Sequence, residues 1–250
     1  MRSLTVLFVA SIVLSAGCSD SKTPATPSPS GEAKPVTSTT PKATQPSTPQ
    51  PPTTAAKGAI SFADLAPSMV PAAIRTQGSV DRAIEWTDKN GRNIVTFAAR
   101  EKMTDGHLTD RWLYINHDVV SGDGSRRLRS VKDGVKSCEF DVHAQMVGAA
   151  LGVTDLDGDE IAELTFAYLT TCTSDVSPMT LKLLLLEDGA KYIIRGTNQI
   201  RMGEGGPTEG GDKRVDPAVS QGPAAFGRHL DAVWARIVGP WSPQGQLLAK

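Results

Sequence analysis

Several sequence motifs that would assign an enzymatic activity are missing from this chain of 250 residues. It contains no G-x-S-x-G, which marks the nucleophile of α/β-hydrolases, and no H-E-x-x-H, which marks zinc proteases. It also lacks the G-x-x-x-x-G-K-[ST] phosphate loop and any C-x-x-C pair. The four histidines have no spacing typical of metal ligands, although Asp141 and His143 could form a zinc or acid–base site with His117. The sequence therefore assigns no catalytic residue.

An excess of basic residues is also missing. After residues 1–57 are set aside, 21 Lys and Arg and 25 Asp and Glu remain, which is a net charge of −4. Proteins that bind nucleic acid or an anionic lipid surface usually carry a net positive charge. The composition therefore argues against both partners.

No apolar run is long enough to cross a bilayer as a helix, which takes roughly 20 residues. The longest candidate at the N-terminus extends from Leu4 to Leu14, after the single positive charge of Arg2, and small residues follow it. A charged start, a short apolar segment and small residues are the anatomy of an export signal. We expect residues 1–17 to be a signal peptide.

The stretch Ser15-Ala16-Gly17-Cys18 resembles the lipobox of bacterial lipoproteins, with Leu14 one place before the position where leucine usually stands. The resemblance implies that Cys18 becomes the first mature residue and carries lipid on its thioether and its amine, and more than one acyl chain is what stable anchoring requires. By the family's sorting rule, Ser19 favours the outer membrane, facing the periplasm or the cell surface. The alternative is an ordinary signal peptide followed by an incidental cysteine.

Residues 18–57 follow as the lipidated cysteine and a tether, because 24 of the 39 positions from 19 to 57 are Pro, Thr or Ser. Such a composition cannot bury enough apolar surface to offset the entropy of ordering. We expect a disordered tether and one folded domain from 58 to 250. That domain contains Cys138 and Cys172. In an exported chain such a pair favours a disulfide, and two free thiols are the alternative.

The domain has the pattern of an α+β fold, mainly antiparallel β-sheet built from hairpins, with a C-terminal amphipathic helix and the disulfide. Four hairpins are expected, at 82–97 around Asn90-Gly91, 111–131, 150–168 and 180–195. Leu183–Leu186 is apolar at every position, which predicts a central strand covered on both faces. The spacing of Phe226, Leu230, Val233, Trp234 and Ile237 predicts one apolar helix stripe. The glycine-rich residues 203–222 predict a disordered loop or, as the alternative, a mobile lid.

Residues 153–164, V-T-D-L-D-G-D-E-I-A-E-L, hold the densest acidic cluster of the chain. Calcium takes six to eight oxygen ligands, and carboxylates that alternate along a tight loop can converge on one point. Counted this way, the candidate calcium ligands are the side chains of Asp155, Asp157, Asp159 and Glu163 and the carbonyl of Ile161. A solvated hairpin loop of Asp and Gly is the alternative.

The acidic loop resembles the D-x-D-x-D-G-x-x-[DE] calcium loops of integrin-type (FG-GAP) β-propeller repeats, in a single copy. It departs from that pattern at Glu160, where the repeats have glycine. Residues 138–196 with their flanks are similar to a family of exported bacterial proteins that are sometimes labelled as associated with surface-polysaccharide biosynthesis. The resemblance implies an envelope protein and supplies no catalytic residues.

Taken together, the sequence predicts a lipoprotein anchored to the membrane through Cys18 whose domain is a non-catalytic binding module for an envelope polysaccharide or protein, with no nucleic acid as partner. Two other hypotheses remain open. One is a carbohydrate hydrolase that uses a pair of carboxylates across a cleft. The other is a purely structural module stabilised by calcium.

Overall fold

A computed structural model describes residues 60–122, 124–203, 205–242 and 246–247. The predicted signal peptide, Cys18 and the predicted tether lie outside these residues, so their roles stay predictions. Within the described part of the chain, the structure has no helix of the length and apolar character needed to cross a membrane.

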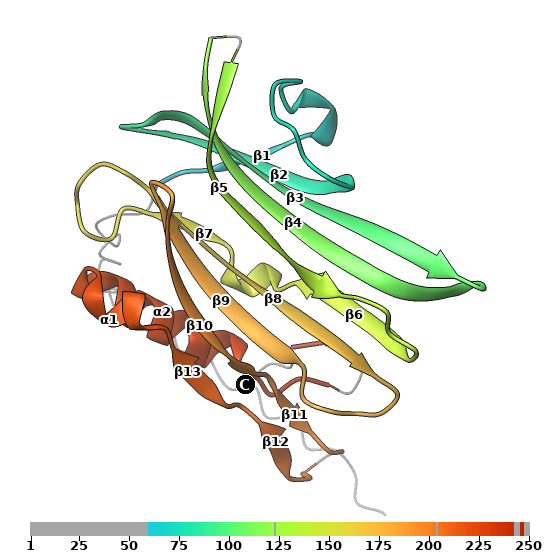
Figure 1. The fold of residues 1–250 in the computed structure, drawn as a ribbon. Helices are drawn as coiled ribbons and strands as arrows, with labels where there is room; N and C mark the ends of the chain where they lie inside the picture. The colour runs from blue at the N-terminus through green and yellow to red at the C-terminus, as the bar shows by residue number, and fades with distance from the viewer. Residues whose placement is uncertain (1–59, 123, 204, 243–245, 248–250) are drawn as a thin grey trace, which may run out of the picture. The chain divides into compact units, whose positions relative to one another are not determined.

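The first sheet is a five-stranded antiparallel meander in which every strand pairs with its neighbours in sequence (Figure 1). Its four long strands are joined by short turns, and the order of the strands in the sheet is the same as their order in the sequence. The strands are β1 (Ala63–Leu65), β2 (Ser79–Asp88), β3 (Gly91–Thr104), β4 (His107–Ser121) and β5 (Gly124–Val135), and the 3₁₀ turn η1 (Pro67–Met69) follows β1.

The second sheet has the strand order β13-β10-β9-β8-β6, with β7 also paired to β8. A separate pair, β11 and β12, lies beyond β10 in sequence. The strands are β6 (Asp141–Met146), β7 (Gly152–Thr154), β8 (Glu163–Thr173), β9 (Thr180–Glu187), β10 (Ala190–Thr197), β11 (Gln199–Arg201), β12 (Thr208–Gly210) and β13 (Lys213–Val215), with the 3₁₀ turn η2 (Gly148–Ala150) before β7.

Two apolar cores hold three layers together: the first sheet, the second sheet, and the helices α1 (Pro217–Gln221) and α2 (Ala224–Ile237). Strand β9 divides its side chains between the two cores, because alternate residues of a strand point to opposite faces. Leu184 and Leu186 face the first sheet, whereas Leu183 and Leu185 face α2. The prediction of a central strand covered on both sides is confirmed.

Helix α2 covers the second sheet with the stripe that the sequence predicts. Its buried side chains are Phe226, Leu230, Val233, Trp234 and Ile237. Pro223 is the residue before its first turn. The predicted fold class, antiparallel β-sheet with a C-terminal helix, is therefore confirmed.

All four predicted hairpins are present, with registers that pair Asp88 with Gly91, Ser121 with Gly124, Thr154 with Glu163, and Glu187 with Ala190. The structure adds the β3–β4 hairpin, which turns at Asp105-Gly106. The expected disorder of residues 203–222 was wrong for 205–222. That segment contributes β12, β13 and α1. Strand β13 pairs with the free edge of β10. Helix α1 begins after Asp216, whose side chain accepts a hydrogen bond from the Ala218 backbone N–H.

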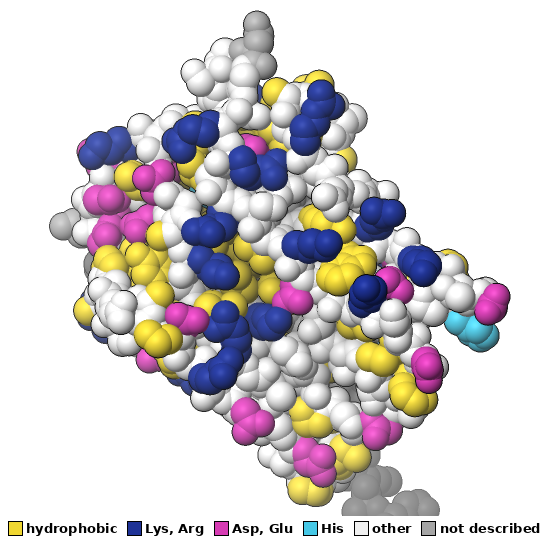
Figure 2. Space-filling view, viewed as in Figure 1, with side chains coloured by type: hydrophobic (Ala, Val, Ile, Leu, Met, Phe, Trp, Pro, Cys, Tyr) yellow, Lys and Arg dark blue, Asp and Glu magenta, His cyan; other side chains and the backbone are white. Residues whose placement is uncertain are grey.

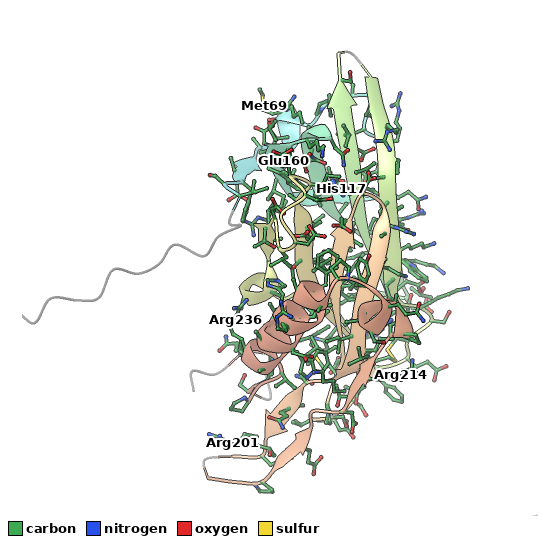
Figure 3. The ribbon with its side chains drawn as sticks, turned by 90° about the vertical axis from the view of Figure 1, so that its left-hand side faces the viewer. Met69, His117, Glu160, Arg201, Arg214 and Arg236 are labelled. Atoms are coloured by element: carbon green, nitrogen blue, oxygen red, sulfur yellow. A yellow bond between two sulfur atoms is a disulfide. The ribbon has the colours of Figure 1, made fainter. Side chains whose placement is uncertain are left out.

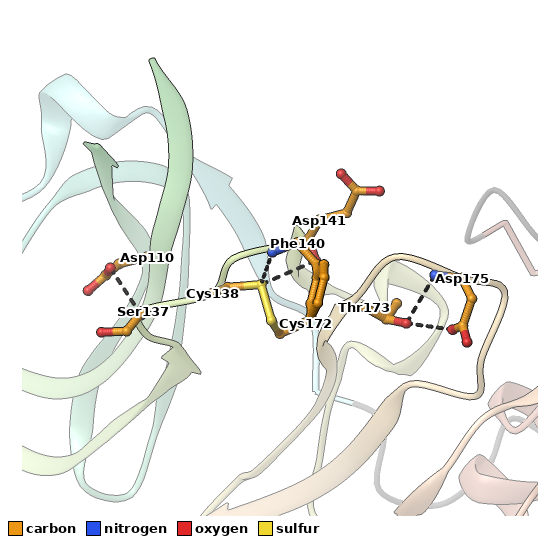
Figure 4. Close-up of a disulfide and its surroundings, with 8 residues drawn as sticks. All are labelled: Asp110, Ser137, Cys138, Phe140, Asp141, Cys172, Thr173 and Asp175. Carbon is orange, nitrogen blue, oxygen red and sulfur yellow. Dashed lines mark hydrogen bonds between the residues drawn. A yellow bond between two sulfur atoms is a disulfide. The ribbon is translucent and has the colours of Figure 1, made fainter. Parts of the chain in front are cut away.

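The Cys138–Cys172 disulfide is confirmed, with the two Cα atoms 5.7 Å apart (Figure 4). Cys138 lies in the segment that carries the chain from the first sheet to the second, and Cys172 lies on β8. The bridge therefore fixes the crossover between the sheets onto a central strand. Closing a loop of this length contributes roughly 3–4 kcal/mol in the chain-entropy account.

Candidate metal centre

The acidic loop joins β7 to β8 at one end of the domain, beside the β2–β3 turn. Figure 2 shows Asp and Glu side chains gathered at that end, on the left, and Figure 3 shows Glu160 there, away from Arg201 and Arg214. Two hydrogen bonds fasten the loop to the turn: the Lys89 backbone N–H donates to the Glu160 carbonyl over 2.9 Å, and the Ala162 N–H donates to Asp88 Oδ2 over 3.1 Å. The first sheet thus holds the loop in place.

Side chains of the loop fold it back on itself. Asp155 Oδ1 accepts from the Gly158 N–H at 2.8 Å and its Oδ2 accepts from the Glu160 N–H at 3.3 Å. Asp159 Oδ1 accepts from the N–H of Ile161 at 2.8 Å. These contacts turn the backbone so that the carboxylates face a common region.

Two groups of three carboxylates come close enough to share an ion, and they have Asp157 in common. Asp155, Asp157 and Asp159 form one group, and Asp157, Glu163 and Glu187 form the other; in each, one oxygen per residue lies within 4.8 Å of the others. Two oxygens that ligate one calcium ion at about 2.4 Å are at most about 4.8 Å apart. The distances therefore allow a calcium ion, and four of the five predicted ligands supply side chains to these groups.

Glu163 is the residue that most clearly requires a partner. Its side chain has no exposed surface, Oε2 accepts from the Leu156 N–H at 2.8 Å, and buried Oε1 has no hydrogen-bond partner among the described residues. A buried carboxylate oxygen without a partner costs roughly 1–3 kcal/mol or more, since it has lost its water. A cation or a proton at this position would remove that cost.

Glu187 is the fifth carboxylate, and it is not among the ligands predicted from the sequence. In the β8–β9 register Leu164 stands opposite Leu186, so the next step places Glu163 and Glu187 side by side. Like charges in that position destabilise a sheet. Only the register of the two strands brings Glu187 to the site, so this ligand could have been predicted only from the pairing of β8 with β9.

The surroundings keep protons on this pair. Burial, the largest cause, raises the pKa of Glu163 to about 8, and the charges of Glu187 and Asp157 act in the same direction. Burial and the charges of Asp157 and Asp159 raise the pKa of Glu187 to about 7. None of the five carboxylates forms an ion pair with a described Lys, Arg or His. The charge of the cluster is therefore not balanced by described side chains.

Glu160 stands where the calcium-loop pattern has glycine, and it adopts a φ of 72°. This is the left-handed region that glycine enters without strain and other residues enter at a cost. The loop therefore makes a left-handed turn at this position with a residue other than glycine. Gly158, with a φ of 87°, supplies a second left-handed position.

The histidines do not join this centre. His117 is buried on β4, 2.8 Å from Asn93 Oδ1 and against the ring of Trp86, whereas Asp141 and His143 are on the exposed edge strand β6. In the described part of the chain, the close groups of three or more candidate ligands contain no histidine. The structure does not bring together the zinc or acid–base site considered from the sequence.

Comparison of the chain with protein-family models, with curated proteins and with solved structures finds no match. The arrangement of the site itself is therefore what bears on function.

Proposed function

We propose that this protein is an outer-membrane lipoprotein, anchored through Cys18, whose β-rich domain is a non-catalytic envelope binding module held in shape by calcium. The unpartnered Oε1 of Glu163, buried beside Asp157 and Glu187, is the observation that carries the proposal. Export is supported by the N-terminal pattern and by the disulfide, since such bonds persist in oxidising compartments. The structural role is supported by the position of the loop, which ties the two sheets together.

Calcium suits this donor set better than zinc or copper do. All candidate side chains offer oxygen, and hard cations select oxygen ligands whereas zinc and copper favour nitrogen and sulfur. Asp155, Asp157, Asp159, Glu163 and Glu187 would hold the ion, with the carbonyl of Ile161 as the remaining predicted ligand. The ion would neutralise Glu163 and fix the loop between β7 and β8.

A non-catalytic role agrees with the burial of Glu163, the carboxylic acid whose pKa is raised most in this cluster. A general acid in a glycosidase must reach the glycosidic oxygen of its substrate. Glu163 is fully buried and cannot make that contact in this conformation. The burial of Glu163 therefore fits a structural role better than the role of a general acid in a hydrolase.

Calcium binding is tested by thermal unfolding of the full chain carrying Cys18→Ser, which cannot be lipidated. At a calcium concentration about 100 times the dissociation constant, the gain is about 2.7 kcal/mol, which is roughly 5–10 °C in a domain of this size. We expect Asp157→Ala to lose the shift and Glu209→Gln, an exposed acid on β12, to keep it. The absence of a shift at millimolar calcium, or an undiminished shift in Asp157→Ala, would exclude the ion site.

The anchor and the absence of catalysis have their own tests. Mass spectrometry of the wild-type protein should find an acylated Cys18 as the first residue, and fractionation should place it with the outer membrane. Turnover of any envelope glycan by the purified protein, abolished by one Asp or Glu substitution, would contradict the binding role.

A further inference from the structure

The outer face of the first sheet carries a groove that is unlike the acidic end of the molecule. It has a volume of about 390 Å³. Figure 2 shows Lys and Arg side chains around exposed apolar surface over β4 and β5, on the right. The residues that line it come from β3, β4, β5 and the flanking segments, and they are Gln77, Arg100, Glu101, Lys102, Asp110, Trp112, Tyr114, Lys132 and Lys136.

Two aromatic rings form the floor of this groove. Trp112 and Tyr114 are two residues apart on β4, so they share one face at a spacing of about 7 Å. Tyr114 is only 5% exposed, and Lys132 stands opposite it on β5. The Lys132 ammonium lies 4.6 Å from the centre of the Trp112 ring and 5.7 Å from that of Tyr114. Tyr114 is therefore nearly covered, and Trp112, which is half-buried beside the Lys132 ammonium, is the ring that a ligand can reach.

Four cations of the groove form no ion pair with a described carboxylate. Arg100, Lys102, Lys132 and Lys136 are exposed, and none has a carboxylate within 4 Å among the described residues.

The two acids of the groove are already engaged. Glu101 pairs with Arg111, and Asp110 Oδ1 accepts from the Ser137 N–H at 3.2 Å. Asp110 partly offsets the charges of Lys102 and Lys136, but the four cations outnumber the two acids of the groove, so the groove favours an anionic ligand.

We propose that this groove binds an acidic polysaccharide, with a sugar ring against Trp112 and carboxylates beside the four cations. The proposal rests on the proposed export, which brings the domain into contact with envelope glycans. The apolar face of a sugar ring can pack against an indole ring, and unpaired cations beside that ring attract the carboxylates of an acidic sugar.

The test uses the full chain carrying Cys18→Ser in calcium-free buffer, with polygalacturonate as the probe and its fully methyl-esterified form as the neutral counterpart. We expect binding to polygalacturonate and none to the ester. Raising the salt from about 0.1 to about 1 M, which shortens the Debye length from about 10 to about 3 Å, should weaken the complex. Equal binding of the two polymers, or binding of neither, would overturn the proposal.

Variants locate the site. Lys132→Gln, an exposed change that leaves the core intact, and Trp112→Ala should each weaken binding at least about tenfold. Arg214→Gln, which removes one exposed cation on β13 (Figure 3), should leave it unchanged. An equal loss in Arg214→Gln would show that only net charge matters, and tighter binding to single-stranded DNA or to phosphatidylglycerol vesicles would replace the polysaccharide with those partners.

Failure of this proposal can be separated from failure of the proposed function. Asp157→Ala, which removes the calcium shift, should bind polygalacturonate normally. A cytosolic location would contradict export and leave the measured affinity of the groove standing. Loss of affinity in Asp157→Ala would instead contradict the groove as an independent site.

Discussion

Replacing Glu160 with glycine should stabilise this domain, which is the reverse of the usual effect of glycine. Glu160 has a φ of 72°, and an ordinary residue in the left-handed region costs about 1–2 kcal/mol. Glycine removes that cost, but it also raises the conformational entropy of the unfolded chain, which destabilises the folded state by about 0.4–1 kcal/mol. The net gain is about 1 kcal/mol, or roughly 2–4 °C in melting temperature.

The side chain of Glu160 contributes little that would be lost. Its carboxylate is 79% exposed and 3.9 Å from the Lys89 ammonium, which is also largely exposed, and such pairs contribute little to stability. The contacts that hold the loop use the Glu160 backbone, whose carbonyl accepts from Lys89 and whose N–H donates to Asp155, and glycine keeps both.

Calorimetry and urea unfolding without calcium would measure the change, with Glu160→Ala as the matched control. Alanine removes the same charge and keeps the Cβ, so it should give no gain. A gain in Glu160→Ala equal to that in Glu160→Gly would mean that charge repulsion, and not backbone strain, is relieved. Unchanged or lower stability of Glu160→Gly would refute the strain itself.

Three further outcomes are expected. Burial, the largest cause, lowers the pKa of His117 to about 4, below its unfolded value, so the folded state binds fewer protons than the unfolded state. The contribution of His117 to stability is therefore complete above pH 6.5 and falls by about 3 kcal/mol as the pH drops toward 4. His117→Gln should flatten this pH dependence in urea titrations, whereas exposed His143→Gln should not. Replacing both cysteines of the disulfide with serine should lower the free energy of unfolding by roughly 3–4 kcal/mol and should make stability insensitive to reductant. A smaller loss would mean that packing alone holds the crossover segment in place. Glu187→Gln should weaken calcium binding at least about tenfold in calorimetric titration, whereas Asp188→Asn should not, and equal effects would remove Glu187 from the ligand set.

The sequence predicts well those elements whose signals are local. The Asn90-Gly91 turn, the apolar stretch at Leu183–Leu186 and the helix stripe ending at Ile237 each depend on residues a few positions apart, and each is confirmed. The disulfide could also be predicted, because the domain from 58 to 250 contains only two cysteines and they can pair in only one way.

The unpredicted features all depend on which strands become neighbours. Glu187 reaches Glu163 only through the β8–β9 register, and β13 is ordered only because β10 offers an edge. The groove collects Arg100, Trp112 and Lys132 from three strands. No periodicity within one strand shows such a surface.

Glycine at position 160 was expected from the loop pattern, and the structure explains what its replacement does. The backbone keeps the left-handed turn at Glu160, because the surrounding hydrogen bonds determine it. The sequence could identify the unusual residue, and only the backbone angles could show that it is strained.

Each sheet is drawn from its own contiguous part of the chain, the first from residues 63–135 and the second from 141 onward. A polypeptide that is threaded through a translocation pore, amino-terminus first, therefore completes one layer while the other is still inside. Until β8 and β9 emerge, the apolar face around Ile84, Phe97 and Ile115 has no cover. Transiently bare surfaces of this kind aggregate, so the proposed export would leave the first half dependent on a holding chaperone in the receiving compartment.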